Sequence, residues 1–228
     1  VLRGVSGLMI GSDQVSQDEW SRALDQLQLQ HRYPGIQAVA WSRYLQPEQL
    51  AGFAAEVKAE GRLDYQIFPP GEREHYLPVD YVSPLDWRNR RVLGFDMLSD
   101  TVRRAAIERS LETGDASLSR PLVLRQEVDV NVQSGVLLYL PVFRPGLPIN
   151  TLEQRQAALL GMVHGAFRSQ DLMDDILGAK TRLFDIILQD MQASDLQLLS
   201  GKALANGWRP RFRSQQTLSL YGRSWTLE

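Results

Sequence analysis

The chain has 228 residues, of which 43% are hydrophobic and 23% are charged, values that are ordinary for a soluble globular protein with a buried core. Its 25 Lys and Arg residues against 27 Asp and Glu residues give a net charge of -2, which provides no broad positive field and argues against nucleic acid as a partner. The absence of cysteine excludes disulfides, thiolate zinc sites and cysteine nucleophiles, and leaves the cellular compartment open.

The ends of the sequence favour a soluble piece of a longer protein. No run of about 18 apolar residues is present. The opening stretch, VLRGVSGLMIGSDQ, has no cleavable signal pattern. As given, the chain is expected to be soluble, and its abrupt ends suggest an excised fragment.

Helical patterns dominate the first 61 residues. Ser16 and Glu19 have capping-box spacing, and apolar residues follow at i, i+4 and i+7, so a helix is expected over about 16–30, extending a weaker helix before it. The segment PGIQAVAWSRYL predicts a strand at about 36–44. A second helix is expected from Pro47 to a C-terminal cap at Gly61. Its apolar face comprises Leu50, Phe53, Ala54 and Val57.

The central residues predict further strands and one more helix. Tyr65 and Ile67 are strand candidates, and a long loop separates them from a second strand around Val79 and Tyr81. Ser99 is expected to be the N-cap of a helix that ends at Gly114.

The remaining strand patterns complete a mixed fold. SLSRPLVL predicts strand structure, SGVLLYLPVFRP a buried central strand, and AALLGMVHGAF another strand whose glycines indicate close backbone approach. Residues 34–167 therefore indicate an α+β arrangement around one antiparallel sheet. A smaller unit should follow and touch it, with Ser169 capping a helix and with strands in RLFDIILQDM and TLSLYGRSWTL.

Seven blocks in order give a family resemblance. PGIQAVAW, YLPVDYVSP, GFDMLSD, ETGDASLSRPLVL, GVLLYLPVF, GMVHGAF and GRSWTL resemble the CHASE domain, the extracytoplasmic sensor of bacterial cyclases, histidine kinases and plant cytokinin receptors. The resemblance spans nearly the whole chain. It implies a long N-terminal juxtamembrane and dimerisation helix at 1–33. A membrane-distal PAS-like ligand-binding subdomain at 34–168 and a membrane-proximal PAS-like subdomain at 169–228 would follow. In this family the whole unit lies between two transmembrane helices.

Asp96 is the ligand contact that the resemblance implies first. In GFDMLSD it matches the aspartate that accepts hydrogen bonds from ligand nitrogen donors in cytokinin receptors. A carboxylate in an apolar pocket is costly unless it is paired, and a ligand N–H can supply a charge-assisted hydrogen bond. The alternative is that Asp96 binds backbone amides at the start of the following helix, or pairs with a nearby arginine.

Further ligand contacts follow from the same resemblance. Tyr81 matches an aromatic position and Leu118 an apolar one, while Leu138 and Leu140 lie on the strand that floors the family's pocket. Met97, next to Asp96, joins the candidate ligand-binding set. The alternative for each of these residues is ordinary core packing.

His164 departs from the plant receptors, which have glycine in its place. An imidazole there would shrink or polarise the pocket, so an adenine-type ligand is not implied. His164 also belongs to the candidate set.

Other chemistry finds little support in the sequence. His31, His75 and His164 are far apart, and the acids from Asp171 to Asp175 lack calcium-loop spacing, so no metal is expected. WRNRRV with Arg103 and Arg104 could recognise a carboxylate or a phosphate, or could be solvated surface.

Catalysis by this chain is not expected. GxSxG, GxxxxGK[ST] and GxGxxG motifs are absent, and Glu72 and Glu74 have no identifiable proton partner. No cofactor is expected either.

The resemblance therefore implies a periplasmic small-molecule-sensing domain of an inner-membrane receptor. Such a domain would relay ligand binding to a cytoplasmic diguanylate cyclase or phosphodiesterase or to a histidine kinase. The resemblance also implies a homodimer through the N-terminal helix, where Val5, Leu8 and Met9 could pair. The alternative is an extracytoplasmic protein-interaction module that senses a partner protein, and a hydrolase ranks third.

Overall fold

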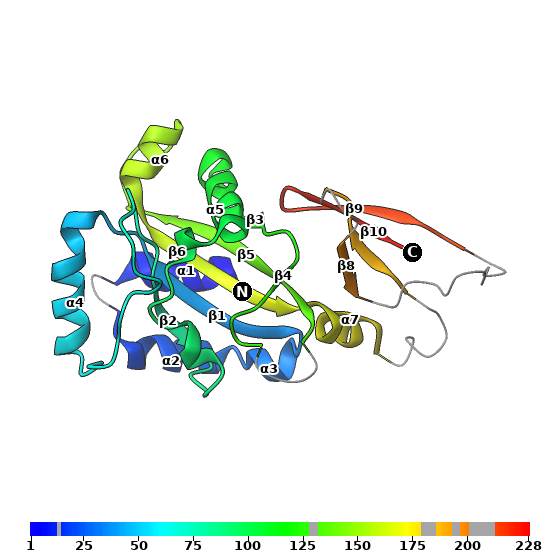
Figure 1. Cartoon of the computed structure of the whole chain (residues 1–228), viewed down its shortest axis with the longest axis horizontal. Coiled ribbons are helices and arrows are strands. Elements are labelled where there is room, and N and C mark those ends of the chain that lie inside the picture. Colours follow the sequence, from blue (N-terminus) through cyan, green and yellow to red (C-terminus); the bar gives the residue numbers. More distant parts are fainter. Residues whose placement is uncertain (13–14, 128–131, 179–185, 193–196, 201–212) are drawn as a thin grey trace.

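Two antiparallel sheets form the core of the chain (Figure 1). The computed structural model describes residues 1–12, 15–127, 132–178, 186–192, 197–200 and 213–228. Within these residues the larger sheet has the order β2-β1-β6-β5-β3, and β4 also pairs with β5. Its strands are β1 (Ile36–Arg43), β2 (Val79–Ser83), β3 (Ser117–Leu118), β4 (Leu122–Val123), β5 (Ser134–Phe143) and β6 (Leu159–Arg168). The predicted α+β class and the antiparallel sheet are confirmed.

The interior of the larger sheet explains the apolar runs of β5 and β6. Both strands have neighbours on either side and are covered on both faces, so seven of the ten positions in each strand are buried and the other three are half-buried. A Cβ on Gly161 would lie 2.2 Å from the carbonyl oxygen of Ser42 on β1, so only glycine fits where the two backbones approach. The predicted central strands and the close approach at glycine are both confirmed.

The second sheet lies at the other end of the molecule (Figure 1). Its order is β8-β7-β10-β9, with β7 (Leu188–Asp190), β8 (Gln197–Ser200), β9 (Gln216–Leu220) and β10 (Arg223–Leu227). The helix α7 (Ser169–Leu177) follows β6 and joins the two sheets through a shared apolar cluster that includes Met173, Val136 and Trp225. The two units therefore touch, as expected, although residues 182–185 of the predicted strand segment RLFDIILQDM lie outside the described part.

The N-terminal segment is not one long helix, which corrects the prediction for residues 1–33. It contains α1 (Leu2–Gly11), α2 (Gln17–Gln26) and the short α3 (Leu29–Arg32). Ser16 and Glu19 form the predicted capping box, and the cap residue is extended (φ -82°, ψ 162°). Because an N-cap residue is not helical, the signal that begins α2 also prevents its continuation from α1.

Helix α1 packs on the face of the larger sheet that also carries α2. Val5 is buried there with Trp20 and Trp41, and Leu8 and Met9 pack against the same cluster. The three residues expected to pair in a dimer therefore contact the chain's own core. Among the described helices, none combines the length and the apolar character needed to cross a membrane.

The opposite face of the sheet carries α5 (Thr101–Thr113) and the segment that precedes it. Asp100, and not Ser99, is the N-cap of α5, because the Asp100 carboxylate accepts hydrogen bonds from the amides of Val102 and Arg103 at 3.0 Å. Gly114 ends α5 in the left-handed conformation (φ 75°), as predicted. Two short helices, η2 (Asn89–Val92) and η3 (Met97–Ser99), precede α5 in the chain.

The remaining helices flank the sheet. The predicted helix after Pro47 is confirmed as η1 (Pro47–Gln49) followed by α4 (Leu50–Ala59), with Phe53 and Val57 buried and Gly61 at φ 82°. The helix α6 (Leu152–Ala158) leads directly into β6.

Two local predictions are wrong. Tyr65 and Ile67 lie in irregular backbone, and the Tyr65 hydroxyl donates a hydrogen bond of 2.7 Å to the carbonyl of Val79. Arg168 takes the N-cap position of α7, and Ser169 is the first helical residue.

Candidate functional site

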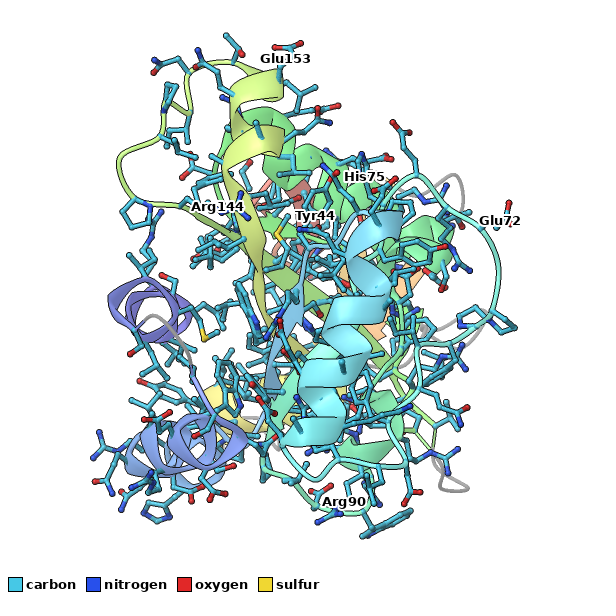
Figure 2. All side chains as sticks on the ribbon, turned by 90° about the vertical axis from the view of Figure 1, so that its left-hand side faces the viewer. Tyr44, Glu72, His75, Arg90, Arg144 and Glu153 are labelled. Carbon is cyan, nitrogen blue, oxygen red and sulfur yellow. The ribbon has the colours of Figure 1, made fainter. Side chains whose placement is uncertain are left out.

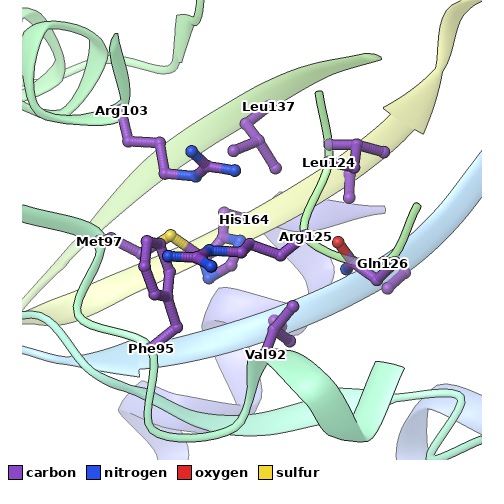
Figure 3. A pocket seen from close by; sticks show the side chains of 12 residues that line it. Val92, Phe95, Met97, Arg103, Leu124, Arg125, Gln126, Leu137 and His164 are labelled. Carbon is purple, nitrogen blue, oxygen red and sulfur yellow. The ribbon is translucent and has the colours of Figure 1, made fainter. Parts of the chain in front are cut away.

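A small cavity lies on the α5 face of the larger sheet, at the centre of the chain (Figure 3). The space open to the centre of a water molecule is about 10 Å³, which is roughly the room that one water needs. Its walls come from β1, β5 and β6, from the segment between η2 and α5, from α5 itself and from the residues after β4. The lining residues are Ala38, Ala40, Val92, Phe95, Met97, Arg103, Leu124, Arg125, Gln126, Leu137, His164 and Ala166.

Small side chains on neighbouring strands create the hollow. Ala38 lies opposite Ala166 in the β1/β6 pairing, and Ala40 lies opposite His164. Paired residues project on the same face of a sheet, so three methyl groups and one imidazole form the floor.

His164 is the polar group of this floor. It is 3% exposed, and its Nε2 shares a hydrogen bond of 3.0 Å with the Ser42 hydroxyl. Its Nδ1 is buried without a hydrogen-bond partner among the described residues. Burial, with a contribution from Arg103, lowers the pKa of His164 to about 3, so the ring is neutral at physiological pH.

Two arginines form the opposite wall. The Arg103 side chain is buried, its Nη1 lies 3.0 Å from the Asp100 carboxylate, and its guanidinium lies 5.3 Å from the centre of the Phe95 ring. The exposed Arg125 places its guanidinium 4.3 Å from the centre of the same ring (Figure 3). The cavity therefore combines apolar walls with two cations.

Asp96 does not line this cavity, although its neighbours Phe95 and Met97 do. Its side chain is fully buried, and Oδ1 accepts hydrogen bonds from the amides of Leu77 at 2.9 Å and Leu98 at 3.1 Å. Its Oδ2 lies 3.3 Å from Nη1 of Arg73.

These contacts set the charge balance of Asp96. Burial raises the pKa of the Asp96 carboxyl above its usual value, while the two amide hydrogen bonds and the charges of Arg73 and Arg104 oppose that shift. The carboxylate caps η3 and holds the segment around residue 77 against it. Backbone amides and an arginine are the partners that the alternative interpretation of Asp96 named.

The other predicted site residues divide between the two faces of the sheet. Met97 and His164 meet at the cavity. Tyr81 pairs with Trp41 on the α1 face and donates a hydrogen bond of 2.7 Å to the carbonyl of Val15. Leu140 pairs with Val163 on that same face.

Leu118 and Leu138 lie on the same face as Leu140 but in a different apolar cluster. They are opposite each other in the β3/β5 pairing and pack in the cluster that joins the two sheets. The structure therefore does not gather the seven predicted residues into one site, and it adds Phe95, Arg103 and Arg125, of which the sequence had marked only Arg103 as a basic residue.

A wider cleft lies on the α1 face, on the side of the molecule where α4 stands (Figure 2). Its volume is about 770 Å³, and Tyr81 is part of its wall. Its lining includes both aromatic and charged residues, among them Trp41, Arg43, Phe53 and Glu56. Tyr44 and Arg144, which also line it, are labelled in Figure 2.

The fold and the cavity define a class of protein: an α+β domain with a small, partly polar cavity on one face of an antiparallel sheet. In the described residues, no group of three or more metal-ligating side chains gathers at one place. The family follows from the comparison with known proteins. The CHASE domain matches residues 13–199, so the chain belongs to the CHASE family of extracytoplasmic sensor domains.

A curated relative agrees with this assignment. The chain is 33% identical over 110 residues to "Probable histidine kinase 4" of Oryza sativa subsp. japonica. That stretch covers 48% of this chain and 10% of the relative, so the match spans only about a tenth of the relative's length.

Proposed function

We propose that this chain is the periplasmic small-molecule-sensing domain of an inner-membrane receptor, and that it relays ligand binding to a cytoplasmic histidine kinase or to a diguanylate cyclase or phosphodiesterase. The observation that carries the proposal is the central cavity, where buried polar atoms of His164 and Arg103 lack hydrogen-bond partners among the described residues. Buried polar atoms are stabilised when a partner arrives, and a small molecule in the cavity would supply one.

The proposal divides the chain into two PAS-like parts. The membrane-distal, ligand-binding part comprises residues 34–168 and the membrane-proximal part residues 169–228, and the two antiparallel sheets support this division. Met97 and His164 contact the ligand directly. Asp96 positions the cavity wall, and its Oδ2 could meet a ligand N–H only if Arg73 moved away.

Helix α5 supplies a route from the cavity to the second sheet. Arg103 at its start lines the cavity, and Arg109, farther along the helix, donates hydrogen bonds of 3.1 Å to the Ser117 hydroxyl and the Leu118 carbonyl. The amide of Leu118 in turn donates to the carbonyl of Tyr221, at the turn between β9 and β10. A ligand that displaces α5 therefore also displaces a contact of the second sheet. It shifts the equilibrium between the two positions of α5 by the difference in its affinity for them.

A thermal-shift screen of nucleobases, amino acids and organic acids tests the sensing function. A ligand at about 100 times its Kd adds about 2.7 kcal/mol of stability, or roughly 5–10 °C for a chain of this size. The matched variants are Ala166→Val, which fills the floor of the cavity and should abolish the response, and Ala54→Val on the exposed face of α4, which should keep it. A response retained in Ala166→Val would refute the assignment of this cavity.

The homodimer is part of the same proposal. Since Val5, Leu8 and Met9 contact the chain's own sheet, a dimer would have to use the exposed side of α1, where Ile10 is 44% exposed. Light scattering that gives only the monomer mass up to high concentration would refute a dimer formed by this chain alone.

The alternative function, a module that senses a partner protein, is favoured by the wide aromatic cleft on the other face. Trp41, Phe53 and Tyr81 line it, and such residues are enriched in protein interfaces. If this alternative holds, no compound class in the screen raises the melting temperature.

A further inference from the structure

The charges that face the central cavity are unbalanced. Arg103 and Arg125 belong to its lining, and none of the lining residues that the structure describes is acidic. The carboxylate that pairs with Arg103 is that of Asp100, which lies 3.0 Å from Nη1 and is itself partly exposed. His164 on the floor is neutral, so the two guanidiniums are the fixed charges that line the cavity.

Arg103 is short of acceptors. Its side chain is 6% exposed, and its contacts with oxygen are the Asp100 carboxylate at 3.0 Å and the Val123 carbonyl at 3.5 Å. Its Nε is buried without a partner in the described part of the chain. A guanidinium presents five donors in a planar fork that matches a carboxylate, so an acceptor arriving in the cavity would pair the unused donor.

Arg125 is placed to move. Its side chain is exposed, and in the described part of the chain its guanidinium contacts the ring faces of Phe95 at 4.3 Å and Phe68 at 5.9 Å. Contacts of this kind at an exposed site are weak compared with a bidentate ion pair. Because Arg103 and Arg125 approach the same ring of Phe95, an anion between them would also reduce their mutual repulsion.

We propose that the ligand of this cavity is a small organic acid whose carboxylate is bound between Arg103 and Arg125, with Arg125 acting as the movable side of the site. The proposal rests on the sensing function assigned to the cavity and names the class of ligand. The apolar body of the acid packs against Phe95, Met97 and Leu137, which already line the space. The volume of about 10 Å³ is too small for any organic acid while Arg125 covers Phe95, so binding requires that this side chain swing off the ring and close on the carboxylate.

Size favours a carboxylate over a phosphate ester. When Arg125 moves, the remaining walls are the strands of the larger sheet and α5. The pairing between the strands fixes the first, and the Asp100 cap fixes the start of the second. A planar carboxylate on a short apolar chain needs less room between these walls than a tetrahedral phosphate does, and it matches both guanidinium forks.

Isothermal titration calorimetry on the whole 228-residue chain tests this inference. The probes are acetate, propanoate, butanoate and benzoate, the corresponding neutral amides, and inorganic phosphate. We expect at least one carboxylate to bind at least 10-fold more tightly than its amide, and to bind more weakly as the salt concentration rises. Arg125→Gln and Arg103→Gln should each reduce that affinity at least 10-fold.

The control variant is Arg120→Gln, which makes the same charge change at an exposed position outside the cavity lining and should leave the affinity unchanged. Arg125→Gln also guards against misfolding as an explanation for Arg103→Gln, because the exposed Arg125 side chain has no structural ion pair within the described residues.

The outcomes separate this inference from the sensing function itself. If an amide binds as tightly as its acid, if phosphate binds and the acids do not, or if Arg125→Gln binds like the parent chain, the carboxylate site is refuted while a sensing cavity stands. If neither these probes nor any compound in the thermal-shift screen binds, both proposals fall.

Discussion

Replacing Asp96 by alanine should destabilise the chain, because its carboxylate holds together two segments that are distant in sequence. Oδ1 accepts hydrogen bonds from the amides of Leu77 and Leu98. Leu77 is fully buried, so no water could replace the lost acceptor at its amide. The substitution would also leave Arg73 without its partner at 3.3 Å.

The expected cost can be worked from these contacts. A hydrogen bond to a charged group contributes about 1.5–3 kcal/mol, so two such bonds give a gross loss of roughly 3–6 kcal/mol. Removing a buried carboxylate returns part of that loss, because burial already raises the pKa of Asp96 and thus disfavours its charged form. We expect a net loss of about 3 kcal/mol for Asp96→Ala, or roughly 10 °C in melting temperature for a chain of this length.

Asp96→Asn separates the structural role from a ligand-contact role. Its side-chain oxygen can still accept from both amides, so the expected loss is about 1 kcal/mol or less, chiefly from the pairing with Arg73. The control is Asp115→Ala, whose carboxylate is 74% exposed and pairs with the exposed Arg3, and which should change stability by less than about 0.5 kcal/mol.

Urea unfolding at pH 7, followed by tryptophan fluorescence, measures all three variants. An Asp96→Ala chain as stable as the parent would refute this account of the carboxylate. Full stability in Asp96→Asn together with a lost ligand response would instead make Asp96 a ligand contact.

Three further predictions follow from buried groups. The pKa of His164 falls from 6.5 in the unfolded chain to about 3 in the folded one, so the folded state binds fewer protons below pH 7. The free energy of unfolding measured in urea titrations should therefore fall by about 2 kcal/mol between pH 7 and pH 5. His164→Gln should remove that part of the pH dependence. Gly161→Ala should cost about 1–3 kcal/mol because its methyl group would meet the Ser42 carbonyl at 2.2 Å, whereas Gly52→Ala, in open space on α4, should stabilise by about 0.5–1 kcal/mol. Asp190→Ala should cost about 3–5 kcal/mol because it leaves the buried Arg223 without its partner at 2.6 Å, and an unchanged urea midpoint would contradict this.

Capping signals in the sequence located the start of α2 correctly but misplaced two other N-caps by one residue, because Asp100 and not Ser99 caps α5, and Arg168 and not Ser169 precedes α7. The Ser16 and Glu19 pair marks the beginning of α2 as predicted. The same pair requires an extended residue just before the helix, and this breaks the segment that was expected to be one long helix. In FDMLSD, Asp96 caps the short helix η3 and Asp100 caps the longer helix α5. Each aspartate accepts a hydrogen bond from the amide two residues later. The sequence pattern of a capping aspartate does not differ from that of a ligand-binding one, so only the contacts with Leu77 and Arg73 reveal what surrounds Asp96.

The candidate site was predicted less well than the strands because its composition depends on register. Alternation along β5 places Leu138 and Leu140 on one face and Tyr139 on the other, and this much follows from the sequence. That His164 lies opposite Tyr139, and therefore on the face away from both leucines, depends on how β5 and β6 are aligned. A shift of one residue in that alignment would have placed His164 beside the leucines, as the resemblance suggested. Arg125 could not be assigned for a related reason, since its place over Phe95 joins two segments 30 positions apart that share no ladder. The charge of the cavity is therefore a property of the tertiary structure, because Arg103 and Arg125 meet at Phe95 only in the folded chain.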